Sequence, residues 1–409
     1  MTKLDRLLAE LCPDGVEYKT LGEIGELVRG SGLQKKNFTN NGIGCIHYGQ
    51  IYTFYGIFAH KTKSFVSPEL AKTLKKVRTG DLIIASTSEN IEDVCKTVAW
   101  LGDDEIVTGG HSTIFKHNQN PKFLSYYFTT KGFFDQKCKL AKGTKVIDIS
   151  GKDLAKIMIP VPPLPVQNEI VRILDNFTEL TTELTTELTA RRTQYEHYSK
   201  HHIDSHINAE HIRLGELGKW SGGGTPSTQN KEFWDNGIIP WVTSKDMIGA
   251  VLSRTQDYIT PEAIKNSTAK LLPKNTVAVV VRSGILRHTL PITYIPFETT
   301  VNQDIKALVV KPGVSAKYVF YAMRANHNEL LNKTRNMGGT VESIIVQKLL
   351  DFTIPVPSLE EQARVVDILD RFDTLTNDIT SGLPAEIAAR QKQYEYYRDK
   401  LLRFERVGV

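Results

Sequence analysis

The feature that most constrains this 409-residue chain is that much of it is written twice. PVPPLPVQNEIVRILDNF, residues 160–177, recurs at an offset of 195 as PVPSLEEQARVVDILDRF, residues 355–372, with ten of eighteen positions identical. Three further pairs follow the same order: LGEIG from 21 and LGELG from 214, AKGTKVIDISGKDL from 141 and NMGGTVESIIVQKLL from 336, ARRTQYEHY from 190 and ARQKQYEYY from 389. Such self-similarity indicates two copies of one structural unit.

Each copy reads as a globular stretch, a PVP turn and a long helical stretch. GDLIIAS from Gly80 and NTVAVVVRS from Asn275 are apolar runs bounded by turn residues, which predicts strands. PKFLSYYFTTKGFFDQ from Pro121 and SAKYVFYAMRANHNELLNK from Ser315 have helical spacing. We predict an α+β fold with two similar mixed α/β domains, joined by two long antiparallel helices as a coiled-coil spacer. The predicted segments are 1–158 (domain), 159–207 (helical), 208–353 (domain) and 354–409 (helical).

The helical stretches each carry one apolar stripe. The first runs through Val171, Leu174, Phe177, Leu180, Leu184 and Leu188. Prolines 162, 163 and 165 can open this helix but cannot lie within it. The uninterrupted stretch from Val166 to about His202 predicts a rod of roughly 55 Å. The second stripe runs through Val366, Leu369, Phe372, Leu375 and Ile379, and SGLP predicts a kink or restart at Pro384. A one-sided helix needs a partner, and the obvious partner of each is the other.

Within the first helical stretch, TELT occurs three times in succession, from Thr178 to Thr189. One unit adds four residues, or about 6 Å of helix. Leucine recurs every four residues, whereas the helix completes a turn every ~3.6 residues. Over a few repeats the leucines therefore stay on nearly the same face and shift only slowly around the helix. We therefore interpret the repeat as a length adjuster, in which the number of units sets the length of the helix. The alternative is an exposed Thr/Glu-rich helix whose length has no such role.

Composition is that of an ordinary globular protein, with 40% hydrophobic and 24% charged residues. No run approaches the ~18 apolar residues of a membrane span, and the start, MTKLDRLLAELCPDG, lacks a signal-peptide core. Cys12, Cys45, Cys95 and Cys138 form no CxxC pair, which favours reduced thiols over a disulfide or metal role. We therefore expect a cytoplasmic protein.

The net charge of +5 permits a nucleic-acid partner without requiring one. Residues 116–145 contain a single acid, Asp135. Seven lysines fall in the same stretch: Lys116, Lys122, Lys131, Lys137, Lys139, Lys142 and Lys145. They form either a solvated face or a surface that meets phosphates.

The sequence contains none of the common catalytic motifs. There is no GxxxxGK[ST], HExxH or GxSxG pattern, and no methyltransferase-type Asn/Asp-Pro-Pro-aromatic motif. PDGVEYK from Pro13 spaces its acids too closely for a nuclease site. The histidines His197, His201, His202, His206 and His211 read as a polar helix end rather than a metal site. We predict no catalytic residue, no metal and no cofactor.

Residues suited to contacting DNA concentrate in the second globular stretch. Gly222, Gly223 and Gly224 let a backbone approach a phosphate, and hydroxyls and lysines follow them. Arginine suits guanine and the side-chain amides suit adenine. The candidates there are Gly222, Gly223, Gly224, Thr225, Ser244, Lys245, Arg282, Arg287, Asn302 and Gln303. Core packing is the alternative for each residue alone. In the first stretch the candidates are Lys35, Lys36, Lys142 and Lys145.

These features together resemble the specificity (S) subunits of type I restriction–modification systems, over nearly the whole chain. The resemblance rests on the two-fold repeat, the two PVP segments, RQKQYEYYRDKLL from Arg390, and the LGE[IL]G, GGGTPS and IPWVTSKDM segments. The tetrapeptide points to the IC-like subgroup, although TAEL would be expected where TELT stands. The first domain departs from the pattern: it has RGSGLQKKNF from Arg29 in place of GGGTP.

The resemblance implies that each globular domain is a target recognition domain reading half of a split site in double-stranded DNA. The helices would set the spacer and dock two methyltransferase (M) subunits, which bind S-adenosylmethionine and methylate adenine; restriction/translocase (R) subunits would join later. Eight repeated helix residues are expected to make duplicated contacts, either with the opposite helix or with two copies of the same partner: Arg191, Gln194, Tyr195, Tyr198, Arg390, Gln393, Tyr394 and Tyr397. Two other classes stay open, a DNA nuclease with an unrecognised site and a helical scaffold protein.

Overall fold

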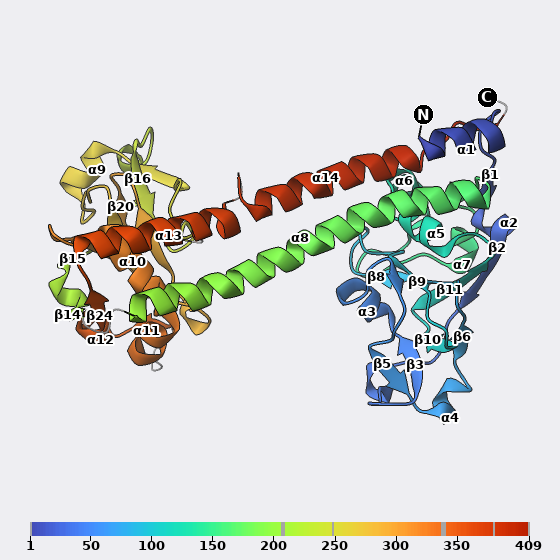
Figure 1. Cartoon of the computed structure of the whole chain (residues 1–409), viewed down its shortest axis with the longest axis horizontal. Helices are drawn as coiled ribbons and strands as arrows, with labels where there is room; N and C mark the ends of the chain where they lie inside the picture. Colours follow the sequence, from blue (N-terminus) through green and yellow to red (C-terminus); the bar gives the residue numbers. More distant parts are fainter. Residues whose placement is uncertain (1, 206–208, 248, 337–340, 379–380, 408–409) are drawn as a thin grey trace. The chain divides into compact units, whose positions relative to one another are not determined.

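The computed structural model describes residues 2–205, 209–247, 249–336, 341–378 and 381–407 (Figure 1). The chain forms two compact units: unit 1 comprises Met1–Thr182 and Ala389–Val409, and unit 2 comprises Glu183–Ala388. Each unit contains one globular domain with parts of both helical stretches. No helix among the described residues is long and apolar enough to cross a lipid bilayer.

Unit 1 is built on two main sheets. The first has the strand order β2-β11-β7-β9-β4, and helices α5 and α6 pack on it. The second has the order β5-β3-β10-β6. The strands are β1 (Tyr18–Thr20), β2 (Gly25–Arg29), β3 (Ile43–Ile46), β4 (Phe58–Ala59), β5 (Ser64–Val66), β6 (Lys75–Val77), β7 (Leu82–Ala85), β8 (Thr87–Ser88), β9 (Thr97–Trp100), β10 (Ile106–Thr108), β11 (Ser112–His117), β12 (Ile147–Asp148) and β13 (Met158–Pro160). The helices are α1 (Lys3–Leu11), α2 (Leu21–Ile24), η1 (Lys35–Asn37), α3 (Tyr48–Thr53), α4 (Pro68–Ala71), α5 (Pro121–Tyr127), α6 (Lys131–Leu140) and α7 (Gly151–Leu154).

Unit 2 repeats this plan with fewer strands. Its sheets have the orders β15-β21-β18-β19 and β17-β16-β20. The strands are β14 (Glu210–Arg213), β15 (Gly218–Gly222), β16 (Ile239–Val242), β17 (Asp257–Ile259), β18 (Thr276–Val280), β19 (Ile292–Ile295), β20 (Thr300–Val301), β21 (Ile305–Val310), β22 (Arg335–Asn336), β23 (Ser343–Ile344) and β24 (Thr353–Val356). The helices are η2 (Leu214–Glu216), η3 (Lys231–Phe233), α9 (Pro261–Asn266), η4 (Gly284–Arg287), α10 (Ala316–Ala325), α11 (His327–Thr334) and α12 (Val346–Asp351).

The two predicted strands are confirmed as β7 and β18, whose residues are fully buried. Each predicted domain helix is in fact two. Thr130 caps α6 by accepting from the Phe133 amide, and Asn326 ends α10 where α11 begins. The PVP segments are not simple turns either, because Pro160 and Pro355 lie in β13 and β24. Those strands pair with β1 and β14, which lie just before the LGEIG and LGELG segments. The last strand of each globular domain is therefore paired with its first strand.

The first helical stretch is the single 41-residue helix α8 (Leu164–Asp204). Its stripe is buried at Val171 and Leu174, but Leu180 is 36% exposed, so the TELT stretch is only loosely covered. The second stretch is two helices, α13 (Leu359–Asn377) and α14 (Leu383–Leu401), which confirms the restart near Pro384. Leu375 is exposed rather than buried, and Ile379 lies outside the described residues.

Within each unit the two helical stretches contact each other through aromatic rings. In unit 1, Phe177 stacks on Tyr397 with 5.5 Å between ring centroids. In unit 2, Phe372 stacks on Tyr198 at 6.2 Å, and the Arg192 guanidinium donates to the Thr376 carbonyl. The pairing of 372 with 198 and of 376 with 192 is the antiparallel sense that the repeat predicts.

Candidate nucleic-acid interface

Four strands of unit 2, two from each of its sheets, end close together. β16 and β20 are parallel and end side by side, with Val242 opposite Val301. β15 and β18 both run antiparallel to β21, and their last residues, Gly222 and Val280, face its start. The loops that follow these strand ends therefore meet, although they are far apart in sequence.

Several candidate residues gather there around the turn 302–304. The Asn302 amide donates to the Val242 carbonyl at 3.0 Å, which places this turn beside Ser244 and Lys245. The Thr225 hydroxyl donates to the Gln303 side-chain carbonyl, and Arg282 forms an ion pair through Nε with Asp304 at 2.7 Å. We call Thr225, Ser244, Lys245, Arg282 and Gln303 the loop edge of unit 2.

Asn302 itself is poorly placed to read a base. It is 8% exposed, and its side-chain oxygen accepts from the Asp304 amide. Its amide group thus stabilises the turn that presents Gln303. Arg287 lies beyond the edge in η4 and pairs with Glu342 at 3.4 Å, a carboxylate that Arg335 also contacts.

The triple glycine is explained by packing. A side chain at Gly223 would lie 1.7 Å from the Val301 carbonyl oxygen, and one at Gly224 would lie 2.1 Å from the Thr268 hydroxyl. The Gly224 amide is already donated to Val301 and its carbonyl accepts from Trp241. Of the three, Gly222 has the loosest surroundings, next to the Lys306 ammonium. The glycines bring the loop against the sheet, and their phosphate contact remains a prediction.

Unit 1 presents the same edge with different side chains. β3 and β10 are parallel and end at Ile46 and Thr108, as β16 and β20 do. The register therefore places His47 and His111 where unit 2 has Thr243 and Asp304. Tyr48 lies between them, with ring centroids 4.4 Å from His47 and 4.8 Å from His111. We call Arg29, Lys35, His47, Tyr48 and His111 the loop edge of unit 1.

The charges at this edge are held in place by local contacts. Arg29 donates to the Gly110 carbonyl at 3.0 Å, and His111 shares a hydrogen bond with Thr87 at 3.1 Å. Burial, and then electrostatic interactions with Lys35 and His111, lower the pKa of His47. Its Nδ1 accepts from the Gly49 amide, so the proton of the neutral ring sits on Nε2. His47 is only 6% exposed, as buried as Asn302, so it packs against Tyr48 rather than reading a base itself.

The predicted lysines of unit 1 differ in exposure and in ion pairing. Lys35 and Lys36 are exposed in η1, and Lys35 lines the same hollow as His47 and His111. Lys142 pairs with Asp153 at 2.9 Å, whereas Lys145 is exposed on the loop before β12. The wider lysine run is not one phosphate-facing surface. Lys122 and Lys131 are paired with acids, and Lys137 is buried, donating to the Glu92 and Val94 carbonyls.

Sequence reasoning missed Arg29, His47, Tyr48 and His111. The signal was available in the repeat: once the strands are matched, IGCIHYGQ from Ile43 corresponds to IPWVTSKD from Ile239, and VTGGHSTIF from Val107 to TVNQDIKAL from Thr300. The side chains at the strand ends have diverged, so only the topology reveals that they are equivalent.

The repeated helix residues predicted to contact partners lie partly inside the units. Tyr195 is 8% exposed and its ring lies 6.3 Å from Phe372, and Tyr394 lies 6.4 Å from Tyr126. Arg191 and Arg390 donate to Gln194 and Gln393, three residues onward in each helix. Tyr198 and Tyr397 are 39% and 36% exposed, which leaves part of each ring on the surface.

No group of three metal-ligating side chains occurs in the part of the chain that the structure describes. His197 and His201 stack on the outside of α8, 6.3 Å apart, and His206 lies outside the described residues. The acids of PDGVEYK, Asp14 and Glu17, are both exposed near the start of unit 1.

Comparison with known proteins agrees with the two-fold plan. A sequence model of the type I restriction modification DNA specificity domain matches twice, at residues 13–191 and 207–389. The chain is 48% identical, over 262 residues, to the specificity subunit of the type I restriction enzyme EcoR124I/EcoR124II of Escherichia coli. That match covers 63% of this chain and 65% of the relative, just under two thirds of its length. A putative type I restriction enzyme specificity subunit of Haemophilus influenzae is 33% identical, over 71% of this chain and 74% of its own.

Solved structures share the fold. A chain from a type I restriction–modification system, studied for complex assembly and conformational transition, aligns with a TM-score of 0.65 at 19% identity, covering 96% of this chain and 98% of that one. The S subunit from M. genitalium aligns with a TM-score of 0.54 at 15% identity, over 95% and 96% of the two chains.

Proposed function

The chain belongs to the family of type I restriction modification DNA specificity domains, and on that premise we propose that it is the DNA sequence-specificity subunit of a type I restriction–modification complex. Each globular domain reads one half of a bipartite site in double-stranded DNA. The observation that carries this proposal is the equivalence of the two loop edges, which the sheet registers establish independently of any sequence match.

The chemistry of the edges supports two different half-sites. The same strand ends carry His47, Tyr48 and His111 in unit 1, and Thr243, Ser244 and Asp304 in unit 2. A shared scaffold with different hydrogen-bonding groups reads different base edges. Arg282 is the strongest candidate reader, since Asp304 holds its Nε and the two terminal nitrogens can face guanine. Lys245, which is exposed, suits a phosphate.

In this proposal the chain is not itself an enzyme and requires no cofactor of its own. Two methyltransferase subunits bind S-adenosylmethionine and methylate adenine, and restriction/translocase subunits complete the complex in the cytoplasm. The side chains best suited to those partners are the partly exposed rings of Tyr397 and Tyr396 in unit 1, the latter 62% exposed, and, separately, the ring of Tyr198 in unit 2. The buried Tyr195 and the half-buried Tyr394 would act indirectly by holding the helices.

The helices, in the same proposal, set the distance between the half-sites. The TELT units lie in the middle of α8, and the hydroxyls of Thr178, Thr182 and Thr189 bond the helix's own carbonyls four residues earlier. A stretch bonded to itself can gain or lose one unit without changing the domains at its ends. This property is what a length adjuster requires.

The decisive experiment maps methylated adenines in genomic DNA exposed to the complex assembled from this chain and its methyltransferase subunits. We expect one bipartite motif with a fixed spacer, and no methylation by this chain alone in the presence of S-adenosylmethionine. Metal-dependent cleavage by the isolated chain would instead support a nuclease, and salt-insensitive behaviour without DNA affinity would support a scaffold.

A further inference from the structure

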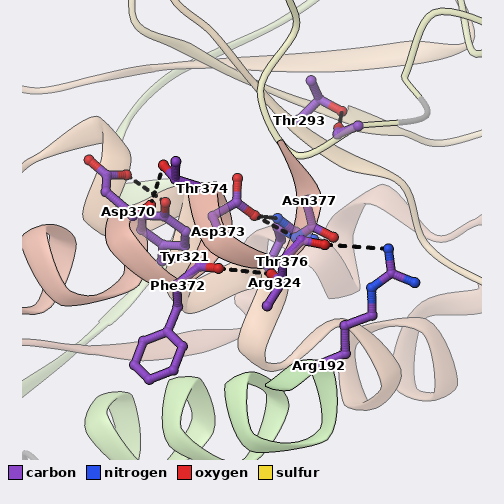
Figure 2. Close-up of polar contacts among 11 residues, drawn as sticks. Arg192, Thr293, Tyr321, Arg324, Asp370, Phe372, Asp373, Thr374, Thr376 and Asn377 are labelled. Atoms are coloured by element: carbon purple, nitrogen blue, oxygen red, sulfur yellow. Dashed lines mark hydrogen bonds and ion pairs between the residues drawn. The ribbon is translucent and has the colours of Figure 1, made fainter. Parts of the chain in front are cut away.

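Each long helix is fastened to its own domain by the same set of polar contacts. In unit 1, the Asp175 carboxylate of α8 accepts from the Lys122 ammonium at 2.8 Å and from the Tyr126 hydroxyl at 2.9 Å. In unit 2, the Asp370 carboxylate of α13 accepts from Lys317 and Tyr321, each at 2.5 Å (Figure 2 shows the Tyr321 contact). The donors come from α5 and α10, the equivalent helices of the two domains.

A second contact lies eight residues earlier in each helix. The side-chain carbonyl of Gln167 accepts from the Asn120 amide at 2.9 Å, and that of Gln362 accepts from the Ser315 amide at 2.8 Å. The amide nitrogens of the two glutamines donate to the Pro162 and Pro357 carbonyls. Both glutamines are at most 1% exposed. We call the glutamine and the aspartate together the register clamp of each helix.

Apolar packing alone would not fix the axial position of these helices. An apolar stripe with residues three and four apart presents nearly the same face after a shift of about one turn. A buried glutamine is different, since its donors and acceptor must meet particular partners or remain unsatisfied at a large cost. The aspartate adds a charged contact that involves a fully buried tyrosine hydroxyl on one side and an ammonium on the other.

Resting on the proposed function above, we propose that Gln167 and Asp175 in α8, and Gln362 and Asp370 in α13, are positioning residues. They fix the axial position of each helix on its own domain, and the spacer length is set from that position. The clamp of α8 ends where the TELT units begin at Thr178. A change in the number of units is then passed on along the helix, because the helix cannot slide on its domain to absorb it. In unit 2, Arg324 reinforces the fixed end by pairing with Asp373 at 3.4 Å (Figure 2).

The test uses the complex assembled with its methyltransferase subunits and reads the spacer length in methylated DNA. In the Gln167→Leu/Asp175→Asn variant we expect both half-sites to be kept. The variant complex should methylate sites with a spacer one base pair longer or shorter at least about tenfold more than the unaltered complex does. A tenfold change corresponds to roughly 1.4 kcal/mol in the balance between helix positions. Gln362→Leu/Asp370→Asn provides the same test on unit 2 if the first variant folds poorly.

The matched control is Ile83→Val, a core substitution in β7 of unit 1 that lowers stability in a hydrophobic cluster containing no residue of α8. It should keep a single spacer at reduced thermal stability. A folded clamp variant that still methylates only the original spacer would overturn the inference while leaving the proposed function intact. Failure of the unaltered complex to methylate any bipartite motif would instead remove the proposed function itself.

Discussion

At the scale of single residues, we expect Arg282 to read a base and Lys245 to contact a phosphate. Arg282→Ala should cost roughly 1–3 kcal/mol of binding to the preferred site and relax one base position, and Arg282→Lys should relax it too, since lysine lacks the planar fork. Lys245→Ala should weaken binding to all sequences and reduce the salt slope by about one. The measurement is binding of the assembled complex to a randomised DNA library at several salt concentrations.

The control for these variants is Lys311→Ala. Lys311 is exposed and follows the far end of β21, opposite the loop edge of unit 2. Its replacement should change neither the preferred sequence nor the salt slope. If Arg282→Ala and Lys245→Ala behave like Lys311→Ala, the loop edge does not face DNA.

His117 gives unit 1 a pH-dependent stability. Burial lowers the pKa of His117 to about 4, and its Nε2 has no hydrogen-bond partner among the described residues. The folded state therefore binds this proton more weakly than the unfolded chain, whose histidine titrates near 6.5. The contribution is complete above pH ~6.5 and is lost as pH falls towards 4.

Between pH 6.5 and 5 the loss attributable to His117 should be about 2 kcal/mol. His117→Phe should therefore flatten the pH dependence of urea-induced unfolding by that amount, whereas His288→Phe, at an exposed position, should leave it unchanged. Equal slopes for the His117→Phe variant and the unaltered chain would show that the buried ring does not titrate as described.

At the scale of helices, the buried tyrosines hold the helical stretches to their domains. Burial raises the pKa of Tyr195 to about 12, and the ring packs in the core of unit 2 near Phe372. Tyr195→Ala should destabilise unit 2 by about 3–5 kcal/mol, as large-to-small aromatic changes in cores do. Scanning calorimetry should detect a lower transition temperature.

Tyr396→Ala is the contrasting change, because this ring is 62% exposed on α14. It should leave the transition temperature within error and weaken assembly with the methyltransferase subunits if the exposed rings are the partner surface. Unchanged stability and unchanged assembly in the Tyr195→Ala/Tyr394→Ala double variant would contradict both the packing and the docking interpretation.

At the scale of the whole molecule, the TELT units make the spacer adjustable. Deleting Thr182–Thr185 should shorten α8 by about 6 Å and turn it by about 40° past a full turn, so the apolar stripe nearly realigns. We expect both half-sites to be kept and the unspecified spacer to shorten by about one base pair, whose rise is ~3.4 Å. Methylation mapping of the assembled complex measures this directly.

Deleting only two or three of these residues should rotate the stripe off its partner and destabilise the chain. An unchanged spacer after the four-residue deletion, with methylation retained, would mean that the repeat does not set the distance. Altered half-site sequences would mean that the domains are not independent of the helices.

The sequence by itself determined the two-fold plan, the long helix and its restart, because these depend on local signals. Repeated segments, proline positions and a stripe of apolar residues act within a few turns of chain, so they can be read without the fold. The strands at β7 and β18 were evident for the same reason: each is a short apolar run between turn residues.

Only the tertiary structure decided which polar side chains share a surface. Asn302 became a buried turn residue and Lys142 an ion-pair partner, whereas His47 and Tyr48 came together with His111, which lies 64 residues after His47 in the chain. Contacts across a sheet depend on strand order and register, which no local pattern encodes. The register clamps were invisible for that reason too: a glutamine in a helix looks like a surface residue until its partners on another helix are in place.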